Sequence, residues 1–545
     1  MEPTEIQKEI INYDGNTAIL ASPGSGKTYV ISEKIKRILK DDNLHPYQGV
    51  VAISYTRKAS AHLKRRTLGE GISPKNSFFG TIDNFCLTQI ILLFGFYVFG
   101  HPKKELEVIG INDLGSNKHA TFNWITTKHP DYKDIDAHNW NQIKKLYRYG
   151  YVLVESLELL SLHIMLNCKA CQNHLRARYK YIFIDEYQDA DTYTNQIFTF
   201  MVSLGIKGVA VGDEKQSIFG FAHKSNVFLK ALETNQEFRT FKLDRNFRCA
   251  ISIINYSNRL LNQNSEILET TEKGVSFIPV KGSERDIADY LSENIPKICE
   301  RLHIEDRSEV AILVKNSRTQ NIIDQCLVIP HRVIETTILD MDLNPCSRLY
   351  ATLLRFYFDP KMPLLAVIDE FVDFEELSIF ERKQIQQEGE IIRTICYSQH
   401  EDLVSHFQSI ASLILNNVEE RNSKEKLTQV LQDEHSLNSY KPTSTNEVQI
   451  MTLHKSKGLE FEVVFHLNMS EWELPGKRIE NNDFYNPIYT NWEQDLNLHY
   501  VGITRAKKEC ILVRGTKRTN SNNELKCAKD SEFLSINDLP KLRKR

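Results

Sequence analysis

The sequence predicts an α/β protein built on open parallel sheets, and three observations support this fold class. A short apolar run at residues 17–21 suits a buried parallel strand, and an amphipathic run that ends at Leu39 follows it. The same order recurs, because apolar runs at residues 50–55, 181–184 and 209–212 each end in a polar cluster. The chain has 545 residues, which at roughly 100–200 residues per domain corresponds to three or four domains.

The composition is that of an ordinary globular protein, with 41% hydrophobic and 26% charged residues. The net charge of −3 neither implies nor excludes a nucleic-acid partner, because phosphates contact a local groove rather than the whole surface. The acidic N-terminus lacks the cationic and apolar segments of a signal peptide. The longest apolar stretch, residues 90–99, is shorter than the ~18 residues that a membrane span needs. We therefore expect a cytoplasmic protein.

Ten cysteines are scattered through the chain, which favours reduced, buried thiols over a disulfide framework. Cys168, Cys171 and the nearby His174 resemble half of a zinc site. No second pair of ligands follows at a suitable spacing, and a structural zinc ion needs four ligands. We therefore expect no metal at these cysteines.

Residues 21–28, Ala-Ser-Pro-Gly-Ser-Gly-Lys-Thr, have the pattern of a phosphate-binding loop between the first strand and the helix that follows. The glycines let backbone N–H groups converge on a polyphosphate, and the helix dipole favours negative charge there. Lys27 can reach the β- and γ-phosphates, and the Thr28 hydroxyl can bind Mg²⁺. Ala21 stands where the usual pattern begins with glycine. The predicted nucleotide-binding residues of the loop are Ser22, Gly24, Ser25, Gly26, Lys27 and Thr28.

Two carboxylates follow the apolar run at residues 181–184. Asp185 can hold Mg²⁺ through water, and Glu186 can orient and deprotonate an attacking water. The alternative, an ordinary turn at a strand end, does not explain their combination with a phosphate loop upstream. Further along, Gln216 could sense a γ-phosphate or position water, and Arg248 is a candidate transition-state cation or a surface arginine.

Gln7 lies in a short helix expected at residues 4–12, immediately before the first strand. It is either a solvated helix residue or a group that recognises a nucleotide base, and its position in the sequence leaves both open.

Candidate nucleic-acid contacts follow two of the predicted strands. Tyr55, Thr56 and Arg57 start a basic helix at the carboxyl end of a strand, where open α/β sheets bind ligands, although such a charge run is usually a solvated face. Phe219 and Phe221 could stack on bases, and each stack contributes ~1–3 kcal/mol.

The order of these motifs resembles the UvrD/Rep-like superfamily 1 DNA helicases. In the first half the resemblance rests on residues 21–28, 185–189, 211–221 and 246–248. In the second half it rests on residues 310–314 with Arg318, on residues 448–461 and on residues 500–507. These seven signals stand in the family's order across nearly the whole chain.

The resemblance implies a motor in which ATP and Mg²⁺ lie between two RecA-like domains. It assigns adenine recognition to Gln7, the place of a stacking tyrosine to Phe247, and the ribose contact to Glu460. Thr28 and Asp185 would hold the metal, and Glu186 would activate the water. The implied γ-phosphate contacts are Gln216, Arg248 and, as arginine finger from the second domain, Arg505. The implied contacts to single-stranded DNA are Thr56, Phe219, Phe221 and His454.

Three departures from the family fall on the implied DNA track. Residues 56–60 replace the family's Thr-Asn-Lys-Ala-Ala, residues 80–85 replace its Gly-Thr-Phe-His-Ser-Phe, and Ala222 replaces a common arginine. The ATP residues are intact. The resemblance therefore implies ATP hydrolysis more directly than processive unwinding.

We expect two motor domains, each interrupted by a reduced, mainly helical insertion. The expected division is 1–95 with 178–265 (first motor domain), 96–177 (its insertion), 266–345 with 441–515 (second motor domain), 346–440 (its insertion) and 516–545 (a basic tail). The tail is polar and is expected to fray in solvent.

This reduced layout is similar to the helicase-like subunits of Gabija-type anti-phage systems, which work with an OLD-family nuclease partner. The leading hypothesis is an ATP-driven translocase on single-stranded or tailed duplex DNA that moves 3′ to 5′. The alternative is a DNA- or nucleotide-sensing ATPase that regulates a partner nuclease with little unwinding of its own. A binding protein without hydrolysis is disfavoured because all the ATP residues are present.

Overall fold

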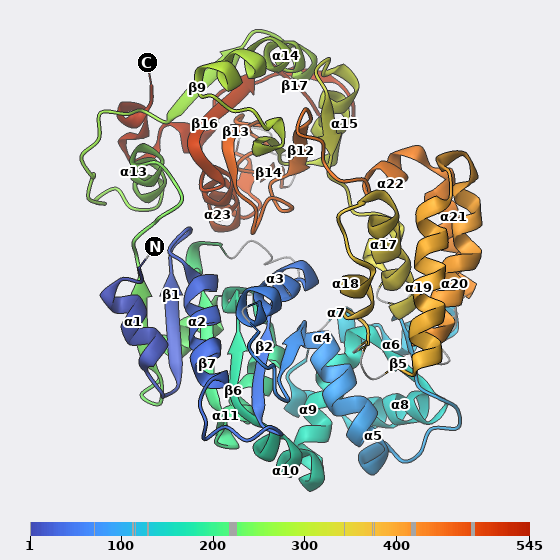
Figure 1. Ribbon diagram of the computed structural model, residues 1–545. Coiled ribbons are helices and arrows are strands. Elements are labelled where there is room, and N and C mark those ends of the chain that lie inside the picture. The colour runs from blue at the N-terminus through green and yellow to red at the C-terminus, as the bar shows by residue number, and fades with distance from the viewer. Residues whose placement is uncertain are drawn as a thin grey trace.

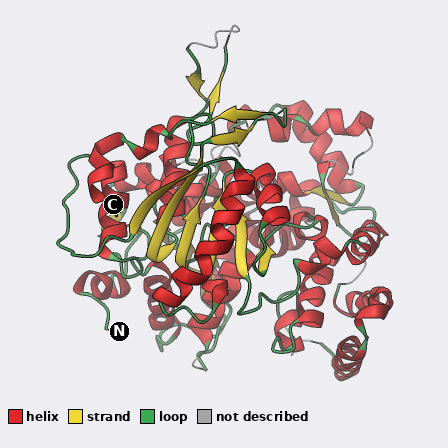
Figure 2. Ribbon diagram, turned by 90° about the horizontal axis from the view of Figure 1, so that it is seen from above, coloured by secondary structure: helices red, strands yellow, loops and turns green. Residues whose placement is uncertain are grey.

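The computed structural model describes residues 2–69, 71–111, 114, 116–127, 130–216, 226–342, 344–372, 374, 377–415, 421–480, 486–520 and 522–544. Two six-stranded sheets dominate the structure, and every strand pair within them is parallel. Figure 1 shows the first sheet in the lower half and the second at the top, with a helical bundle beside them. In Figure 2 the long strands lie in the interior with helices around them, and short strands protrude at the top. The predicted α/β fold with two parallel motor sheets and two helical insertions is confirmed.

The first sheet has the strand order β3-β2-β6-β7-β1-β8. Central β1 is buried because its apolar side chains alternate between two cores: Ala18 faces one core and Ile19 faces the other. The strands are β1 (Thr17–Ala21), β2 (Gly49–Ile53), β3 (Phe78–Gly80), β6 (Tyr179–Ile184), β7 (Lys207–Gly212) and β8 (Arg239–Leu243).

Helices cover both faces of this sheet. The first helix starts as the sequence predicts, because Thr4 and Gln7 form a reciprocal capping box. Ile10 and Ile35, from the first two helices, pack with Ile19 on one face, whereas Phe198 packs on the other. The helices are α1 (Glu5–Asn12), α2 (Lys27–Leu39), α3 (Arg57–Leu68), α4 (Ile82–Phe85), α11 (Thr192–Ser203) and α12 (Val227–Glu233).

The first insertion shares the core of the first sheet, since Ile143 and Leu160 belong to the same apolar cluster as Val51. The sequence predicts a mainly helical insertion, and within it residues 151–153 form a strand that pairs with residues 107–109. The elements are a π-helical turn (Cys86–Ile91), α5 (Leu92–Phe99), β4 (Glu107–Ile109), α6 (Ser116–Phe122), α7 (Trp124–Thr127), α8 (Ala137–Arg148), β5 (Tyr151–Leu153), α9 (Leu157–Asn167) and α10 (Lys169–Arg178).

One helical stretch, Ile82–Phe99, is long and apolar enough by length and composition to cross a membrane, with a mean hydropathy of 1.7. The apolar run at residues 90–99 is part of this longer helix, which residues 82–89 continue without a break although Asp83, Asn84 and Gln89 are polar. Phe85, Ile90 and Phe94 of this stretch pack in the core of the first sheet, as a core helix of a globular protein does.

The second sheet has the order β11-β12-β10-β13-β16-β9. Helix α13, which the expected division places with the first sheet, packs on the second through Ile253, Tyr256 and Leu260. The elements are α13 (Ile251–Leu261), β9 (Val275–Val280), α14 (Glu284–Arg301), β10 (Val310–Val314), α15 (Ser317–Cys326), β11 (His331–Val333), β12 (Val448–Thr452), β13 (Phe461–His466), β14 (Lys477–Arg478), β15 (Ile488–Tyr489), α23 (Trp492–Ile503) and β16 (Ala506–Gly515).

The second insertion is a helical bundle with its own core, in which Leu349, Tyr350, Phe407 and Leu427 are buried. Its elements are α16 (Ile338–Met341), α17 (Pro345–Phe358), α18 (Leu364–Ile368), α19 (Ile379–Thr394), α20 (Leu403–Ile414), α21 (Arg421–Gln432) and α22 (Glu434–Asn438).

The C-terminal segment is folded, so the expectation of a fraying tail was wrong. Strands β17 (Lys517–Thr519) and β18 (Leu525–Cys527) form an antiparallel hairpin. Phe533 and Leu539 are fully buried against the second sheet, and the Lys544 N–H donates to the Val275 carbonyl at 2.7 Å. A few apolar side chains thus outweigh the polar composition of this segment.

Candidate active site

The phosphate loop turns from β1 into α2 as the sequence predicts. Gly24 and Gly26 have φ of 68° and 87°, which favours glycine at both positions. A Cβ on Gly24 would lie 2.5 Å from Asn246 Oδ1, and one on Gly26 would lie 2.9 Å from Gln7 Nε2. Conformation and close packing therefore both require glycine here.

The loop fits a bound polyphosphate. Gly26 is the N-cap of α2 and supplies no capping side chain, so α2 presents its first N–H groups at the loop. The Ser25 hydroxyl oxygen is buried and has no hydrogen-bond partner among the described residues. Ser22 is tied to β8, since its N–H donates to the Leu243 carbonyl at 2.9 Å. Thr28 follows Lys27 in the first turn of α2.

Lys27 faces the carboxylates of the first sheet. Its ammonium lies 3.4 Å from Glu186 Oε1. Burial alone would lower the pKa of Lys27, but the charges of Glu186, Asp213 and Asp185 raise it. The ammonium is therefore held in its charged form, as binding a phosphate requires.

Asp185 and Glu186 stand at the carboxyl end of β6, and Glu186 has a left-handed backbone with φ of 57°. Burial and the neighbouring Glu186 raise the pKa of Asp185 to about 6. Burial works against ionisation of Glu186 too, but Lys27, Lys457 and the Gln188 amide lower its pKa to about 2. The pKa values of these two adjacent carboxyl groups are thus pushed apart, as is typical of neighbouring groups that take different roles in an active site.

The hydroxyl of Thr28 and the carboxylate of Asp185 are oxygen donors of the kind that fits Mg²⁺, which commonly takes one or two protein ligands beside phosphates and waters. No group of three or more His, Cys, Asp or Glu residues in the described part of the chain is arranged to hold a metal. This applies also to Cys168, Cys171 and His174. All ten cysteines are free thiols.

Gln7 lies beside the loop and is 5% exposed. Its side-chain N–H donates to the Ser25 carbonyl at 3.1 Å, and its Oε1 accepts from the Thr4 N–H at 3.0 Å. The structure therefore excludes the solvated-helix alternative and places Gln7 behind the phosphate loop.

Arg505 reaches the first sheet from the second and is 1% exposed. Its Nη2 donates to Gln216 Oε1 at 3.1 Å, and its Nε donates to the Val501 carbonyl at 3.1 Å. Burial and the nearby Arg248 lower the pKa of Arg505 to about 10. The guanidinium still stays charged at neutral pH.

A hydrogen-bond chain joins Glu186 to Arg505. The Gln188 amide donates to Glu186 Oε2, and its Oε1 accepts from the Asp213 N–H at 2.9 Å. Asp213 Oδ2 accepts from the Gln216 amide at 2.8 Å, and Gln216 meets Arg505. This chain connects the predicted water-activating group to the predicted arginine finger. Sequence reasoning missed that Gln188 and Asp213 belong to this chain, although they lie in the motifs at residues 185–189 and 211–221.

Phe247 and Arg248 border the same site. The Phe247 N–H donates to the Gly24 carbonyl at 2.9 Å, its ring is 37% exposed, and Arg245 lies 4.9 Å from the ring centre. Arg248 Nε lies 2.7 Å from Glu460 Oε2, an ion pair between the two halves of the chain. Phe247, Arg248 and Glu460 are thereby brought together as the sequence predicts.

Lys457 is a site residue that sequence reasoning missed. Its ammonium pairs with Asp189 and donates to the Gln216 carbonyl at 2.7 Å. The side chains of Lys457 and Asp189 are 9% and 0% exposed. Both lie in motifs that the sequence singles out, but nothing in the sequence pairs residues so far apart.

The predicted DNA contacts are only partly described. Tyr55 is 40% exposed at the carboxyl end of β2, and the Thr56 hydroxyl caps α3 by accepting from the Ala59 N–H at 3.2 Å. His454 is half-buried after β12, and burial lowers its pKa. The Arg57 side chain and residues Phe219 and Phe221 lie outside the described part of the structure. The described contacts thus neither support nor exclude the DNA track.

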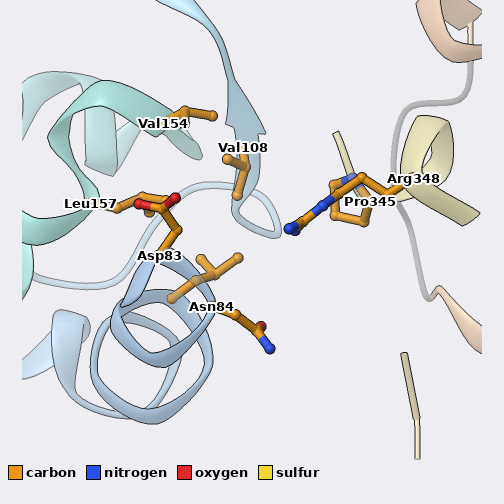
Figure 3. Close-up of a pocket in the computed structure, with 8 residues that line it drawn as sticks. Asp83, Asn84, Val108, Val154, Leu157, Pro345 and Arg348 are labelled. Atoms are coloured by element: carbon orange, nitrogen blue, oxygen red, sulfur yellow. The ribbon is translucent and has the colours of Figure 1, made fainter. Parts of the chain in front are cut away.

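A separate small pocket lies where the first insertion meets the helical bundle (Figure 3). Arg348 extends from α17 toward the helix that carries Asp83 and Asn84, over apolar side chains that include Val108 and Leu157 (Figure 3). None of the predicted nucleotide residues lines it. Residues 80–85, one of the departures noted above, therefore reach this junction.

Comparison with known proteins finds two matching families. Residues 6–222 match a family described as AAA domain, and residues 368–515 match the UvrD-like helicase C-terminal domain. Gabija protein GajB of Bacillus cereus (strain VD045) is 27% identical over 536 residues, covering 94% of this chain and 95% of that protein.

Two helicases are similarly related. ATP-dependent DNA helicase Rep of Buchnera aphidicola subsp. Schizaphis graminum is 22% identical over 638 residues, covering 96% of this chain and 94% of that protein. ATP-dependent DNA helicase PcrA of Staphylococcus epidermidis is 23% identical over 619 residues, covering 94% and 83%. The similarity to both extends along nearly the whole chain.

Proposed function

We propose that this chain, whose residues 368–515 match the UvrD-like helicase C-terminal domain, hydrolyses ATP between its two parallel sheets and thereby moves along single-stranded DNA. The observation that carries this proposal is the hydrogen-bond chain from Glu186 through Gln216 to Arg505. It joins a partly buried carboxylate on one sheet to a buried arginine on the other. A γ-phosphate between them would be sensed by both halves of the chain at once.

In this proposal the phosphate loop binds the nucleotide and Lys27 neutralises its β- and γ-phosphates. Thr28 and Asp185 would hold Mg²⁺, which would supply Lewis-acid stabilisation of the transferred phosphoryl group. Glu186 accepts the proton of the attacking water. Gln7 and Phe247 bind the base, Glu460 the ribose, and Arg248 and Arg505 the charge that develops on the γ-phosphate.

We propose single-stranded or tailed duplex DNA as the substrate, with movement from 3′ to 5′. The residues assigned to the strand are Tyr55, Thr56, Arg57, Phe219, Phe221 and His454. Closure of the two sheets around the nucleotide would shift them along the strand, and hydrolysis would release them. The expected division into motor domains and insertions, and a cytoplasmic location, are parts of the same proposal.

A second candidate is a regulatory ATPase that controls a nuclease partner and unwinds little by itself. The similarity to Gabija protein GajB over 94% of this chain favours it. In this second candidate, binding of nucleotide or DNA at the same site would control the activity of an OLD-type nuclease partner.

Steady-state ATPase with and without single-stranded DNA, run beside strand displacement on 3′-tailed and 5′-tailed duplexes, tests both. Stimulated ATPase with unwinding from the 3′ tail alone supports the translocase. Stimulated ATPase without displacement supports the regulatory form. A chain without ATPase activity under any of these conditions refutes both.

A further inference from the structure

Lys34 is a fully buried lysine that the proposed chemistry does not use. It lies on α2, two turns after the phosphate loop. Its ammonium donates to the Ile10 carbonyl at 2.8 Å and to the Tyr13 carbonyl. Both acceptors stand at the C-terminal end of α1, where carbonyls lack partners within the helix. No basic residue of α1 itself occupies its last turn.

Helix α1 is therefore bound to the phosphate loop and its helix at both ends. At its N-terminal end, Gln7 donates to the Ser25 carbonyl at 3.1 Å and lies against Gly26. At its C-terminal end, Lys34 binds two carbonyls. A helix of eight residues is not stable alone in water. These two attachments, together with the buried Ile10, hold it in place.

The charges around Lys34 shift its pKa without removing its contacts to α1. Burial, Arg37 and Lys207 lower the pKa of Lys34 to about 7, and Asp14 opposes them. Asp14 is itself paired with Arg37 and accepts from the Tyr181 hydroxyl at 3.1 Å. A neutral lysine amine keeps two N–H donors, so both carbonyls can remain bound on either side of this pKa. The contact therefore does not depend on charge.

We propose that Lys34 is a positioning residue for base recognition: by fixing the end of α1 against α2, it holds Gln7 where a purine bound at the phosphate loop meets its amide. This inference rests on the proposed nucleotide site. It assigns Lys34 no contact with the nucleotide. Its effect on binding passes through Gln7, so it should act on ligands that carry a base and spare those that do not.

The experiment compares MgATP and magnesium tripolyphosphate by titration calorimetry on the full-length chain and its variants. Lys34→Met removes the donors at nearly the same side-chain length. We expect MgATP binding to weaken about tenfold, the value of one lost hydrogen bond, while tripolyphosphate binding stays within about twofold. The matched control is Lys36→Met, since Lys36 lies on the same helix and pairs with Glu33 at 3.0 Å.

A double-mutant cycle separates positioning from general damage. Gln7→Ala should weaken MgATP as much as Lys34→Met does, and the double variant should lose no more than either single variant. Lys34→Arg, which keeps its donors, should restore the preference for ATP. If Lys34→Met does not fold, Lys34→Gln replaces it in the same cycle.

Equal weakening of both ligands by Lys34→Met would overturn the inference, as would additive losses in the double variant. Unchanged MgATP binding by a folded Lys34→Met chain would overturn it as well. A wild-type chain that binds neither ligand would instead refute the proposed function. The experiment therefore distinguishes a failure of the Lys34 proposal from a failure of the proposed nucleotide site.

Discussion

The guanidinium of Arg505 donates to the side-chain oxygen of Gln216 at 3.1 Å across the boundary between the two sheets. Arg505 comes from the turn between α23 and β16, and Gln216 follows β7. Each residue is at most 3% exposed, so the contact is shielded from water. The two sheets therefore meet here through polar groups that the sequence assigns to the γ-phosphate.

Arg505→Ala should lower kcat for ATP hydrolysis by about 10³–10⁵-fold, because an arginine finger stabilises charge only in the transition state. MgATP affinity, measured separately by calorimetry, should change much less. Arg301→Ala is the control, since Arg301 forms a surface pair with Glu509 away from the site. A loss of less than about tenfold in kcat for Arg505→Ala would argue against the assignment.

Lys27→Ala should abolish ATP turnover and weaken tripolyphosphate binding, because its ammonium is the buried cation of the phosphate loop. Lys8→Ala, at an exposed lysine that pairs with Glu5, should leave both unchanged. Calorimetry with tripolyphosphate and a phosphate-release assay check the two effects. Wild-type turnover in Lys27→Ala would refute the nucleotide site.

Lys457→Met should destabilise the folded chain by about 3–5 kcal/mol, because it leaves the Asp189 carboxylate buried without its cation. Asp189→Asn alone should also destabilise it. The double variant should recover part of the loss, since no unpaired charge remains. Urea unfolding monitored by circular dichroism checks this, and additive losses would show that the pair is not coupled.

ATPase activity should rise with pH through about pH 6, as Asp185 loses its proton and becomes able to hold Mg²⁺. Because Mg²⁺ and the proton compete for this carboxylate, a higher Mg²⁺ concentration should move the midpoint to lower pH. A pH–rate profile at two Mg²⁺ concentrations checks this. A midpoint independent of Mg²⁺ would exclude Asp185 as the titrating ligand.

The contribution of Asp185 to folding stability runs the opposite way. Its folded pKa is raised above the ordinary value of 3.8. Its contribution is therefore fully present below about pH 4 and is lost as the pH rises through 6. Activity and this part of the stability thus change in opposite directions over the same interval, as expected for a strained functional group.

The sequence predicts the strands β1, β2 and β7 and the phosphate loop well, because continuous apolar runs and glycine turns indicate local structure. It does not predict that Lys457 meets Asp189, since this contact depends on how the two sheets face each other. It misjudges the C-terminal segment because Phe533 and Leu539 stand among lysines and aspartates. The composition of a segment does not indicate whether a surface distant in the sequence, here the second sheet, will bury it.

The sequence also does not predict which sheet covers α13, and this has a physical cause. Helix α13 follows the motif at residues 246–248 so closely that the sequence assigns it to the first sheet. Its apolar face, with Ile253 and Leu260, is covered by the second sheet instead. An amphipathic pattern predicts that a helix is half-buried, but not which neighbour buries it.

All strands of the first sheet precede residue 244 and all strands of the second follow residue 274. The Phe247 N–H is bonded to the phosphate loop, while the Ala250 N–H donates to the Lys507 carbonyl on the second sheet at 2.7 Å. The two sheet domains are thus comparable to the subunits of a dimer, joined by the short segment between Phe247 and Ala250. A short tether gives an effective concentration in the millimolar range. Their mutual affinity can therefore be weak, as the proposed closing and opening around one nucleotide would require.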